Sequence, residues 1–337
     1  MKSCFIIAEA GVNHNGDLAM AKQLVDVAVE SGADAVKFQT FRAESLVTSG
    51  AERAAYQKQN MGGDESQFEM LKKLELSFED FRILKKYCDG KKIEFLSTPF
   101  DEECARFLVE DLGMARVKIP SGELTNLPYL QVLASFQKPM ILSTGMSDLQ
   151  EVRQAVSVIE KISEVSLTIL HCTTNYPCLF EEVNLRALQT LRETFRRPVG
   201  YSDHTLGIEV AIAAVALGAS VIEKHVTLSR TLKGPDHRCS LEPEEFKKMV
   251  ESIRHIEKAL GTGEKKPTSS EMEMRKLARR SLVFSRSLSA GTTLCREDLL
   301  ARRAGEGVAP QDLEKLVGLK LKVNKKSGDM VSWDDVQ

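Results

Sequence analysis

The stretch Arg197–Ser240, RPVGYSDHTLGIEVAIAAVALGASVIEKHVTLSRTLKGPDHRCS, decides how this chain folds. Two short apolar runs, PVGYS and ASVIE, lead to His204 and His225. A helix-length apolar stretch separates the two runs, and we expect Thr205 to cap its start and Gly218 to end it. This strand–helix–strand pattern places both histidines at the same ends of neighbouring parallel strands. Because such strands lie about 4.8 Å apart, two imidazoles there can meet over one metal ion.

Either histidine alone could be an ordinary strand-end residue. The two in register, with Asp203, Glu223 and Asp236 close in sequence, favour a functional site.

The same alternation of strand and helix runs through most of the chain. Between the first two strand candidates, for example, Asp17 starts a helical pattern that ends at Gly32. The strand candidates are residues 4–10, 33–40, 93–99, 115–122, 138–145, 166–173, 197–204 and 219–226. Eight strand–helix repeats over about 250 residues predict a parallel (β/α)8 barrel, the TIM barrel. A doubly wound open sheet is the alternative, but the first turn reads AGVNHNG and lacks the GxGxxG pattern typical of that fold.

Composition narrows the classes of partner. The chain has 337 residues, enough for a full-sized core and a small extra domain. It is 42% hydrophobic and 28% charged with a net charge of −2, so we expect neither nucleic acid nor a membrane as a partner. The seven cysteines show no CxxC spacing, and we interpret them as reduced thiols of a cytoplasmic protein. Cys172 either touches the site or is a buried small hydrophobe, and the second role is favoured.

The chain divides into regions of different character. Residues 1–262 contain the barrel, and residues 41–76 form an unusually long connection that we expect to be a loop over the barrel mouth, or else surface decoration. A last amphipathic helix over 243–260 leads to a polar linker at 263–280. Short strands and glycine turns fill residues 281–337, a segment too small to make a strong core alone.

In such a barrel, chemistry occurs at the carboxyl ends of the strands. In ADAVKFQT, Val36 and Phe38 share one face, which leaves Lys37 and Gln39 pointing into the barrel mouth. The other polar groups at or just beyond strand ends are Glu9, Thr98, Lys118, Ser121, Glu123, Ser143, Ser202, His204, Glu223 and His225, whereas Lys224 has the opposite parity. Two lysines with several hydroxyls suit a small anion such as a phosphate or carboxylate. Together with the histidine pair, they predict a metal-assisted lyase or transferase.

Nine motifs then identify a family resemblance. They are IAEAGVNHNG, VKFQT, FLSTPF, VKIPSGE, ILSTGM, LHCTTNYP, YSDHTLG, EKHVTL and GPDH, in this order. They resemble the N-acetylneuraminate (sialic acid) synthase family of nonulosonate synthases. The segment from Ser281, with RRAGEG, is similar to the antifreeze-like (SAF) domain of those enzymes.

The resemblance implies a reaction between phosphoenolpyruvate and the open-chain aldehyde of an N-acetylmannosamine-type sugar, giving N-acetylneuraminate and phosphate. It implies a divalent metal, Mn²⁺ or Mg²⁺, on His204 and His225 that polarises the aldehyde oxygen. Glu123 matches the carboxylate that handles protons and water in the family, although it could instead only pair with Lys118. Glu9 is a further catalytic candidate.

Binding residues also follow from the resemblance. The phosphoenolpyruvate positions are Lys37, Thr98, Lys118, Ser121, Ser143 and Ser202, and the family's asparagine contact falls on either Thr174 or Asn175. The sugar positions are Glu9, Gln39, Tyr176 and Asp236, with Asn60 and Asp64 as candidates in the long connection. Arg303 matches an arginine that reaches from the SAF domain of one subunit into the barrel of the other, so a homodimer with exchanged C-terminal domains is implied. Arg303 could otherwise be a solvated basic turn.

Three alternatives remain open at this stage. Legionaminate and pseudaminate synthases, which use 2,4-diacetamido-trideoxy sugars, resemble the chain nearly as well, and the sequence does not fix whether the sugar is phosphorylated. A Schiff-base aldolase using Lys37 or Lys118 is more distant. A tail that only binds ice or carbohydrate, with no enzyme, explains none of the strand-end groups.

Overall fold

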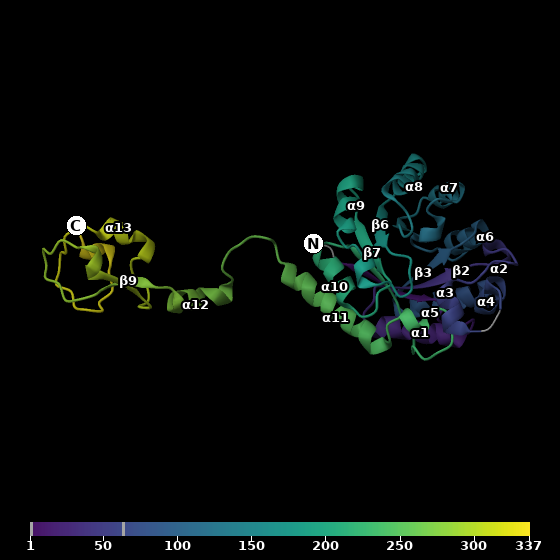
Figure 1. The fold of residues 1–337 in the computed structure, drawn as a ribbon, viewed down its shortest axis with the longest axis horizontal. Helices are drawn as coiled ribbons and strands as arrows, with labels where there is room; N and C mark the ends of the chain where they lie inside the picture. The colour runs from purple at the N-terminus through teal and green to yellow at the C-terminus, as the bar shows by residue number, and fades with distance from the viewer. Residues whose placement is uncertain (1–2, 63–64) are drawn as a thin grey trace. The chain divides into compact units, whose positions relative to one another are not determined.

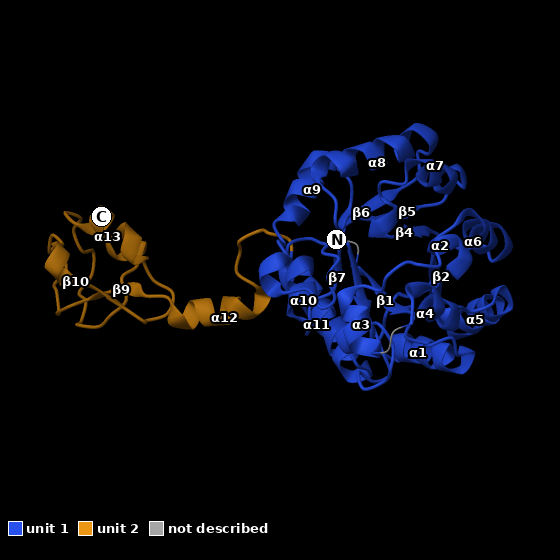
Figure 2. Cartoon of the chain, turned by 45° about the vertical axis from the view of Figure 1, so that its right-hand side comes forward, with its two compact units in different colours: residues 1–261 blue, residues 262–337 orange. Residues whose placement is uncertain are grey.

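The computed structural model describes residues 3–62 and 65–337. The chain divides into two compact units, residues 1–261 and residues 262–337 (Figure 2).

The first unit is a barrel of eight parallel strands (Figure 1). The strands are β1 Phe5–Gly11, β2 Ala35–Thr40, β3 Glu94–Pro99, β4 Val117–Ile119, β5 Met140–Ser143, β6 Leu167–Cys172, β7 Val199–Asp203 and β8 Val221–His225. Their order is β3-β2-β1-β8-β7-β6-β5-β4, and the end strands β3 and β4 contact each other to close the ring. All eight predicted strands and the TIM-barrel architecture are confirmed.

Helices surround this barrel. They are α1 Leu18–Glu30, α5 Phe78–Lys91, α6 Glu102–Arg106, α7 Leu127–Ser135, α8 Leu149–Ile162, α9 Ala187–Phe195, α10 Glu209–Ala216 and α11 Pro243–Leu260. Their apolar faces and the strands share one large core, as expected when a parallel sheet is covered by helices. As predicted, the Asp17 side chain caps α1 by accepting from the backbone N–H groups of Ala19 and Met20.

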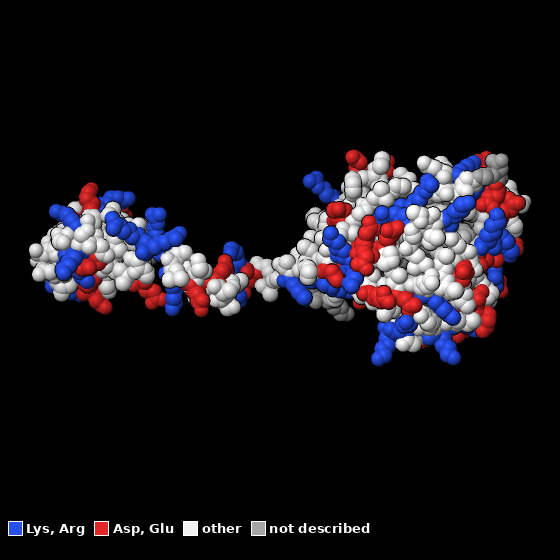
Figure 3. Space-filling model, turned by 90° about the horizontal axis from the view of Figure 1, so that it is seen from below, with Lys and Arg blue, Asp and Glu red and all other residues white. Residues whose placement is uncertain are grey.

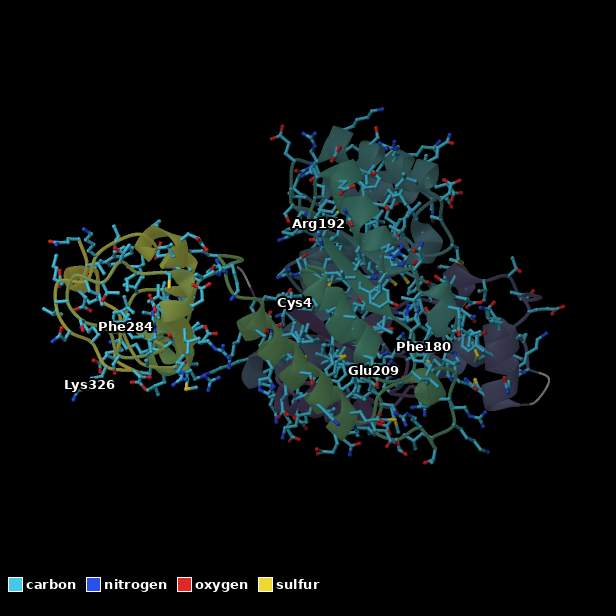
Figure 4. The ribbon with its side chains drawn as sticks, turned by 60° about the vertical axis from the view of Figure 1, so that its left-hand side comes forward. Cys4, Phe180, Arg192, Glu209, Phe284 and Lys326 are labelled. Carbon is cyan, nitrogen blue, oxygen red and sulfur yellow. The ribbon has the colours of Figure 1, made fainter. Side chains whose placement is uncertain are left out.

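The start of α10 differs from the prediction. Thr205 does not cap it, and the helix begins only at Glu209, which is labelled in Figure 4. The reason is that the Thr205 hydroxyl donates instead to Asp203, at 2.8 Å. Gly218, with φ of +89°, follows the helix end as expected.

The long connection after β2 is more ordered than the predicted loop. It contains three short helices, α2 Ala43–Leu46, α3 Ala55–Met61 and α4 Gln67–Leu74. A small apolar cluster holds this region against the barrel mouth; its buried members are Val12, Phe41, Ala43, Met70, Leu71 and Leu74. Within this region α4 is a capped amphipathic helix, in which Ser66 accepts from the Glu69 backbone N–H.

The second unit begins with helix α12, Ser269–Ala278, inside the segment interpreted as a linker, and this helix is exposed along its length. Strands β9 Ser281–Phe284 and β10 Leu299–Arg302 pair in antiparallel fashion, and a four-residue helix, α13, spans Leu313–Leu316. The unit has its own small core, which includes Phe284, labelled in Figure 4, with Leu282 and Leu299.

The surface and the helices bear on the predicted partners. On the face shown in Figure 3, positive and negative side chains are interspersed. Within the part of the chain that the structure describes, no helix has the length and apolarity needed to cross a membrane.

Candidate active site

A pocket of about 320 Å³ opens at the carboxyl ends of the barrel strands. Thirteen of the predicted site residues line it: Glu9, Lys37, Gln39, Thr98, Lys118, Ser121, Ser143, Thr174, Tyr176, Ser202, His204, His225 and Asp236. These residues come from widely separated parts of the sequence. The parallel strands bring them together because their carboxyl ends meet at one opening.

Each pocket lysine has a hydroxyl partner on a neighbouring strand. Lys37 Nζ donates to Thr98 Oγ1 at 3.0 Å, and Lys118 Nζ donates to Ser143 Oγ at 2.8 Å. Both lysines are almost fully buried. Ammonium groups with hydroxyls beside them are donors of the kind that suit an anion.

Glu223 lies between the two lysines, and the sequence interpretation gave it no role. Its carboxylate is 3.7 Å from Lys37 Nζ and 3.5 Å from Lys118 Nζ, and it accepts from the Ser202 hydroxyl at 3.0 Å. Burial would raise the pKa of Glu223, but Lys118 and Lys37 lower it to about 2. The sequence feature that indicates an inward position for Glu223 is its parity along the strand, which it shares with His225.

Burial and nearby charges together set the pKa values of Lys118, Lys37 and the other carboxylates of the pocket. Burial lowers the pKa of Lys118, whereas Glu223 and Glu9 raise that of Lys37 in spite of burial. Burial raises the pKa of Glu9 to about 7, although Lys37 is only 2.8 Å from it. Burial also raises the pKa of Asp236 to about 6. Glu9 can therefore gain or lose a proton near neutral pH.

The two imidazoles face the same pocket, with ring centroids 5.6 Å apart. His204 Nδ1 donates to the carbonyl oxygen of Thr173 at 2.7 Å, which leaves Nε2 with a free lone pair. Burial lowers the pKa of His225 well below its usual value, which favours the neutral form of its ring. His225 Nδ1 is buried and has no hydrogen-bond partner among the described residues.

These features fit a divalent metal ion, since imidazole nitrogens are its common ligands and the Thr173 carbonyl oxygen fixes the ring of His204. Among residues 3–62 and 65–337, no group of three or more His, Cys, Asp and Glu side chains is arranged to hold a metal. Two imidazoles alone would make an open site, in which solvent or substrate oxygens would complete the coordination of a bound ion.

The two residues of the polar pair after β6 lie in different surroundings. Thr174 lines the pocket, and its buried hydroxyl has no hydrogen-bond partner among the described residues. Asn175 is exposed and bonds to Glu182 instead. Cys172 also lines the pocket, with its sulfur 3.9 Å from His204 Nδ1, so it touches the site.

The Ser121 hydroxyl accepts from the backbone N–H of Gly145 at 2.9 Å. A Cβ on Gly145 would lie 2.1 Å from Thr174 Oγ1, so only glycine fits between these two pocket residues. This close approach brings backbone and hydroxyl groups together in the lining of the pocket.

Aromatic and apolar residues also line the pocket. The ring of Tyr176 lies 4.1 Å from that of His204 and 5.2 Å from that of Tyr56 on α3. Gln39 Nε2 donates to Glu9 at 3.3 Å. The apolar lining residues are Val12, Met70, Leu71, Leu74, Phe100, Pro120, Met146 and Pro235.

Glu123 is not among the residues that line the pocket. Glu123 lies in a 3-10 turn after β4, where its half-buried carboxylate accepts from Asn126 at 2.7 Å and makes no pair with Lys118. Arg303 is an exposed residue of the other unit, so its role stays a prediction. Of the long-connection candidates, Asn60 bonds to the Pro235 carbonyl, and Asp64 lies outside the described residues.

Known proteins similar to this chain share both of its parts. The NeuB family model matches residues 24–265, and the SAF domain model matches residues 279–337. The N,N'-diacetyllegionaminic acid synthase of Legionella pneumophila is 52% identical, covering 99% of this chain and 95% of its own length. The enzyme of that name from Campylobacter jejuni is 46% identical, with coverage of 98% and 99%.

A solved structure is also similar. It is that of the N-acetylneuraminic acid (sialic acid) synthetase of Leptospira borgpetersenii in complex with citrate. It superposes with a TM-score of 0.71 at 37% identity, covering 81% of this chain and 90% of its own. The resemblance seen in the sequence is thereby confirmed: this chain belongs to the NeuB family and carries a C-terminal SAF domain.

Proposed function

We propose that this protein is a nonulosonate synthase that condenses phosphoenolpyruvate with an unphosphorylated 2,4-diacetamido-trideoxy hexose, as in legionaminate synthesis. The observation that carries the proposal is the pocket itself. It combines two buried lysines, a set of hydroxyls and two neighbouring imidazoles at one end of the barrel.

Phosphoenolpyruvate would occupy the lysine end. Its phosphate and carboxylate are both anionic, which suits Lys37 and Lys118 with the hydroxyls of Thr98, Ser143 and Ser202. When the anion binds, it joins Glu223 in compensating the two ammonium groups. Before the anion binds, the charge of Glu223 alone favours the protonated form of both lysines.

The sugar aldehyde would lie at the histidine end. A Mn²⁺ or Mg²⁺ ion held by His204 and His225 would supply Lewis-acid polarisation of the aldehyde oxygen. The lysine site orients the phosphoenolpyruvate so that its C3 faces the aldehyde carbon, which makes the reaction effectively intramolecular.

Carbon–carbon bond formation leaves positive charge at C2 of the former phosphoenolpyruvate, and water adds there. Glu9, with a pKa of about 7, is the pocket carboxylate suited to accept the proton of that water. The C–O bond to phosphate then breaks, and phosphate leaves with both bonding electrons. Glu9 takes this role in the proposal in place of Glu123, because Glu123 does not line the pocket.

The choice of sugar rests on two observations. The two cationic lysines lie together with Glu223, whereas Val12, Met70 and Leu74 supply an apolar wall elsewhere in the pocket. Such a wall suits the methyl groups of acetamido and 6-deoxy positions better than a phosphate or a hydroxyl. The 52% and 46% identities to diacetyllegionaminic acid synthases point the same way.

N-Acetylmannosamine is the second candidate, favoured by the similarity to the Leptospira sialic acid synthetase. Our first interpretation of the sequence preferred it. The higher identity of the legionaminic acid synthases reverses that order.

Assembly and location complete the proposal. We propose that the protein is a homodimer in which Arg303 of one subunit reaches the sugar in the barrel of the other. The reaction would take place in the cytoplasm, with which the seven free cysteines are compatible.

The test follows phosphate release from phosphoenolpyruvate with Mn²⁺ and each of three sugars: the diacetamido-trideoxy hexose, N-acetylmannosamine and its 6-phosphate. We expect the first to give the highest kcat/KM, and chelator to abolish turnover. A higher kcat/KM for the 6-phosphate would contradict the assignment of the apolar wall. Trapping of pyruvate by borohydride would support the aldolase alternative instead.

A further inference from the structure

We propose that the buried ion pair between Asp203 and Lys224 is a positioning device that fixes the two imidazoles relative to each other. It acts from the outer side of the barrel wall. The inference builds on the proposed metal site, but its geometry is independent of the metal.

The ion pair joins the two histidine-bearing strands. Lys224 Nζ lies 2.8 Å from Asp203 Oδ2, and neither side chain is exposed to solvent. The two residues are register partners of β7 and β8. Each directly precedes a histidine, so the link spans the two backbones one residue before His204 and His225.

The same pair holds the residue that follows His204. Asp203 Oδ1 accepts from the backbone N–H of Thr205 at 2.9 Å and from its hydroxyl at 2.8 Å. Lys224 Nζ also donates to the Thr205 carbonyl oxygen at 2.6 Å. The backbone on both sides of His204 is therefore tied to β8, which explains why Thr205 is unavailable as a helix cap.

Strand alternation keeps this pair away from the substrates. Glu223 and His225 line the pocket, as do Ser202 and His204, whereas Asp203 and Lys224 do not. They lie on the opposite face of their strands, so they act only through the neighbouring histidines. They are positioning residues and make no contact with the pocket.

A buried ion pair contributes little to stability, because the cost of desolvating two charges offsets most of their attraction. It does, however, fix one geometry, because each charge has few alternative partners in the interior. Two imidazoles that must share one ion need a fixed separation, and the groups behind metal ligands set such separations.

The test compares two double variants. Asp203→Asn with Lys224→Met removes both charges, while the amide oxygen of the new side chain keeps an acceptor for Thr205. Asp34→Asn with Arg254→Met is the control, because it removes another ion pair of 2.8 Å, outside the pocket. Mn²⁺ affinity is measured by electron paramagnetic resonance of the free ion, and ¹⁵N NMR reports the protonated nitrogen of each imidazole.

We expect the first variant to remain folded and to bind Mn²⁺ about ten- to a hundredfold more weakly than wild type. The control should bind Mn²⁺ as wild type does. Equal affinity in the first variant, or an equal loss in the control, overturns the inference. If wild type binds no Mn²⁺, the proposed metal site is wrong, and the NMR comparison alone tests the ion pair. In that case, imidazole spectra that the first variant leaves unchanged overturn the proposal that the ion pair positions the histidines.

A milder variant covers the case in which the double variant does not fold. Thr205→Val keeps the ion pair and the backbone bonds but removes the hydroxyl bond to Asp203. We expect Mn²⁺ binding about two- to tenfold weaker, because one of the hydrogen bonds that fix the Asp203 carboxylate is lost. Unchanged affinity and unchanged imidazole spectra in this variant overturn the inference.

Discussion

Replacing Lys118 by Met removes one of the two charges on which phosphoenolpyruvate binding depends. Met keeps the length and the apolar stem of the side chain, so the packing within the barrel changes little. A charge-assisted hydrogen bond contributes about 1.5–3 kcal/mol, and a charge pair at about 4 Å contributes about 4 kcal/mol at an effective dielectric constant of 20. We therefore expect a loss of about 3–4 kcal/mol in transition-state binding, or about 10²–10³-fold in kcat/KM for phosphoenolpyruvate.

The variant should stay folded. Glu223 keeps Lys37 at 3.7 Å and the Ser202 hydroxyl at 3.0 Å, so its charge remains compensated. Burial already disfavours the charged form of Lys118, as its lowered pKa indicates. Circular dichroism and thermal unfolding would check the fold, and Lys161→Met on α8, outside the pocket, is the matched control. A change of less than tenfold in kcat/KM, in a folded variant, refutes the assignment of the anion site.

Three further predictions address the metal, the pH dependence and the assembly. His204→Ala and His225→Ala should each lower phosphate release at least a hundredfold and weaken Mn²⁺ binding in equilibrium dialysis; turnover that resists chelator contradicts the metal role. Burial raises the pKa of Asp236 from 3.8 to about 6. Below about pH 4 its side chain is neutral in the folded and unfolded states and does not lower the stability. As the pH rises through 6 the buried carboxyl must ionise, and the folded state loses stability. Asp236→Asn should then stabilise the metal-free protein by up to about 3 kcal/mol at pH 7.5 and not at pH 4 in urea unfolding, and an equal effect at both pH values contradicts this reasoning. If Arg303 completes the site of the other subunit, mixing inactive Arg303→Ala and Lys118→Met chains should restore activity at about a quarter of the sites, whereas no recovery in confirmed mixed dimers excludes the exchange.

The barrel and most of the pocket could be predicted because alternation in a strand is a strict geometric rule. Val36 and Phe38 assign Lys37 to the mouth, and the eight strand ends follow in the same way. Parity also gives Glu223 an inward position. Its role did not follow, because the sequence does not show that two lysines from other strands lie on either side of it.

The remaining differences between the sequence predictions and the structure occur where the chain leaves regular secondary structure. A 3-10 turn after β4 directs Glu123 to Asn126, and no periodicity reports the direction of such a turn. Threonine commonly caps helices, but the Thr205 hydroxyl binds Asp203 and its carbonyl oxygen binds Lys224. Local sequence patterns do not report these contacts. The helices of the long connection depend on burial against Val12 and Phe41, a tertiary effect that local propensity does not contain.

The central claim is that one pocket joins phosphoenolpyruvate to a sugar aldehyde with cleavage of the C–O bond at C2. The most direct test supplies phosphoenolpyruvate labelled with ¹⁸O at the bridging oxygen, together with Mn²⁺ and the diacetamido-trideoxy hexose, and follows both products by mass spectrometry. The account predicts that phosphate carries the label and that an unlabelled nine-carbon keto acid accumulates in equal amount. Label retained in the keto acid, or phosphate released without any nine-carbon product, would contradict it.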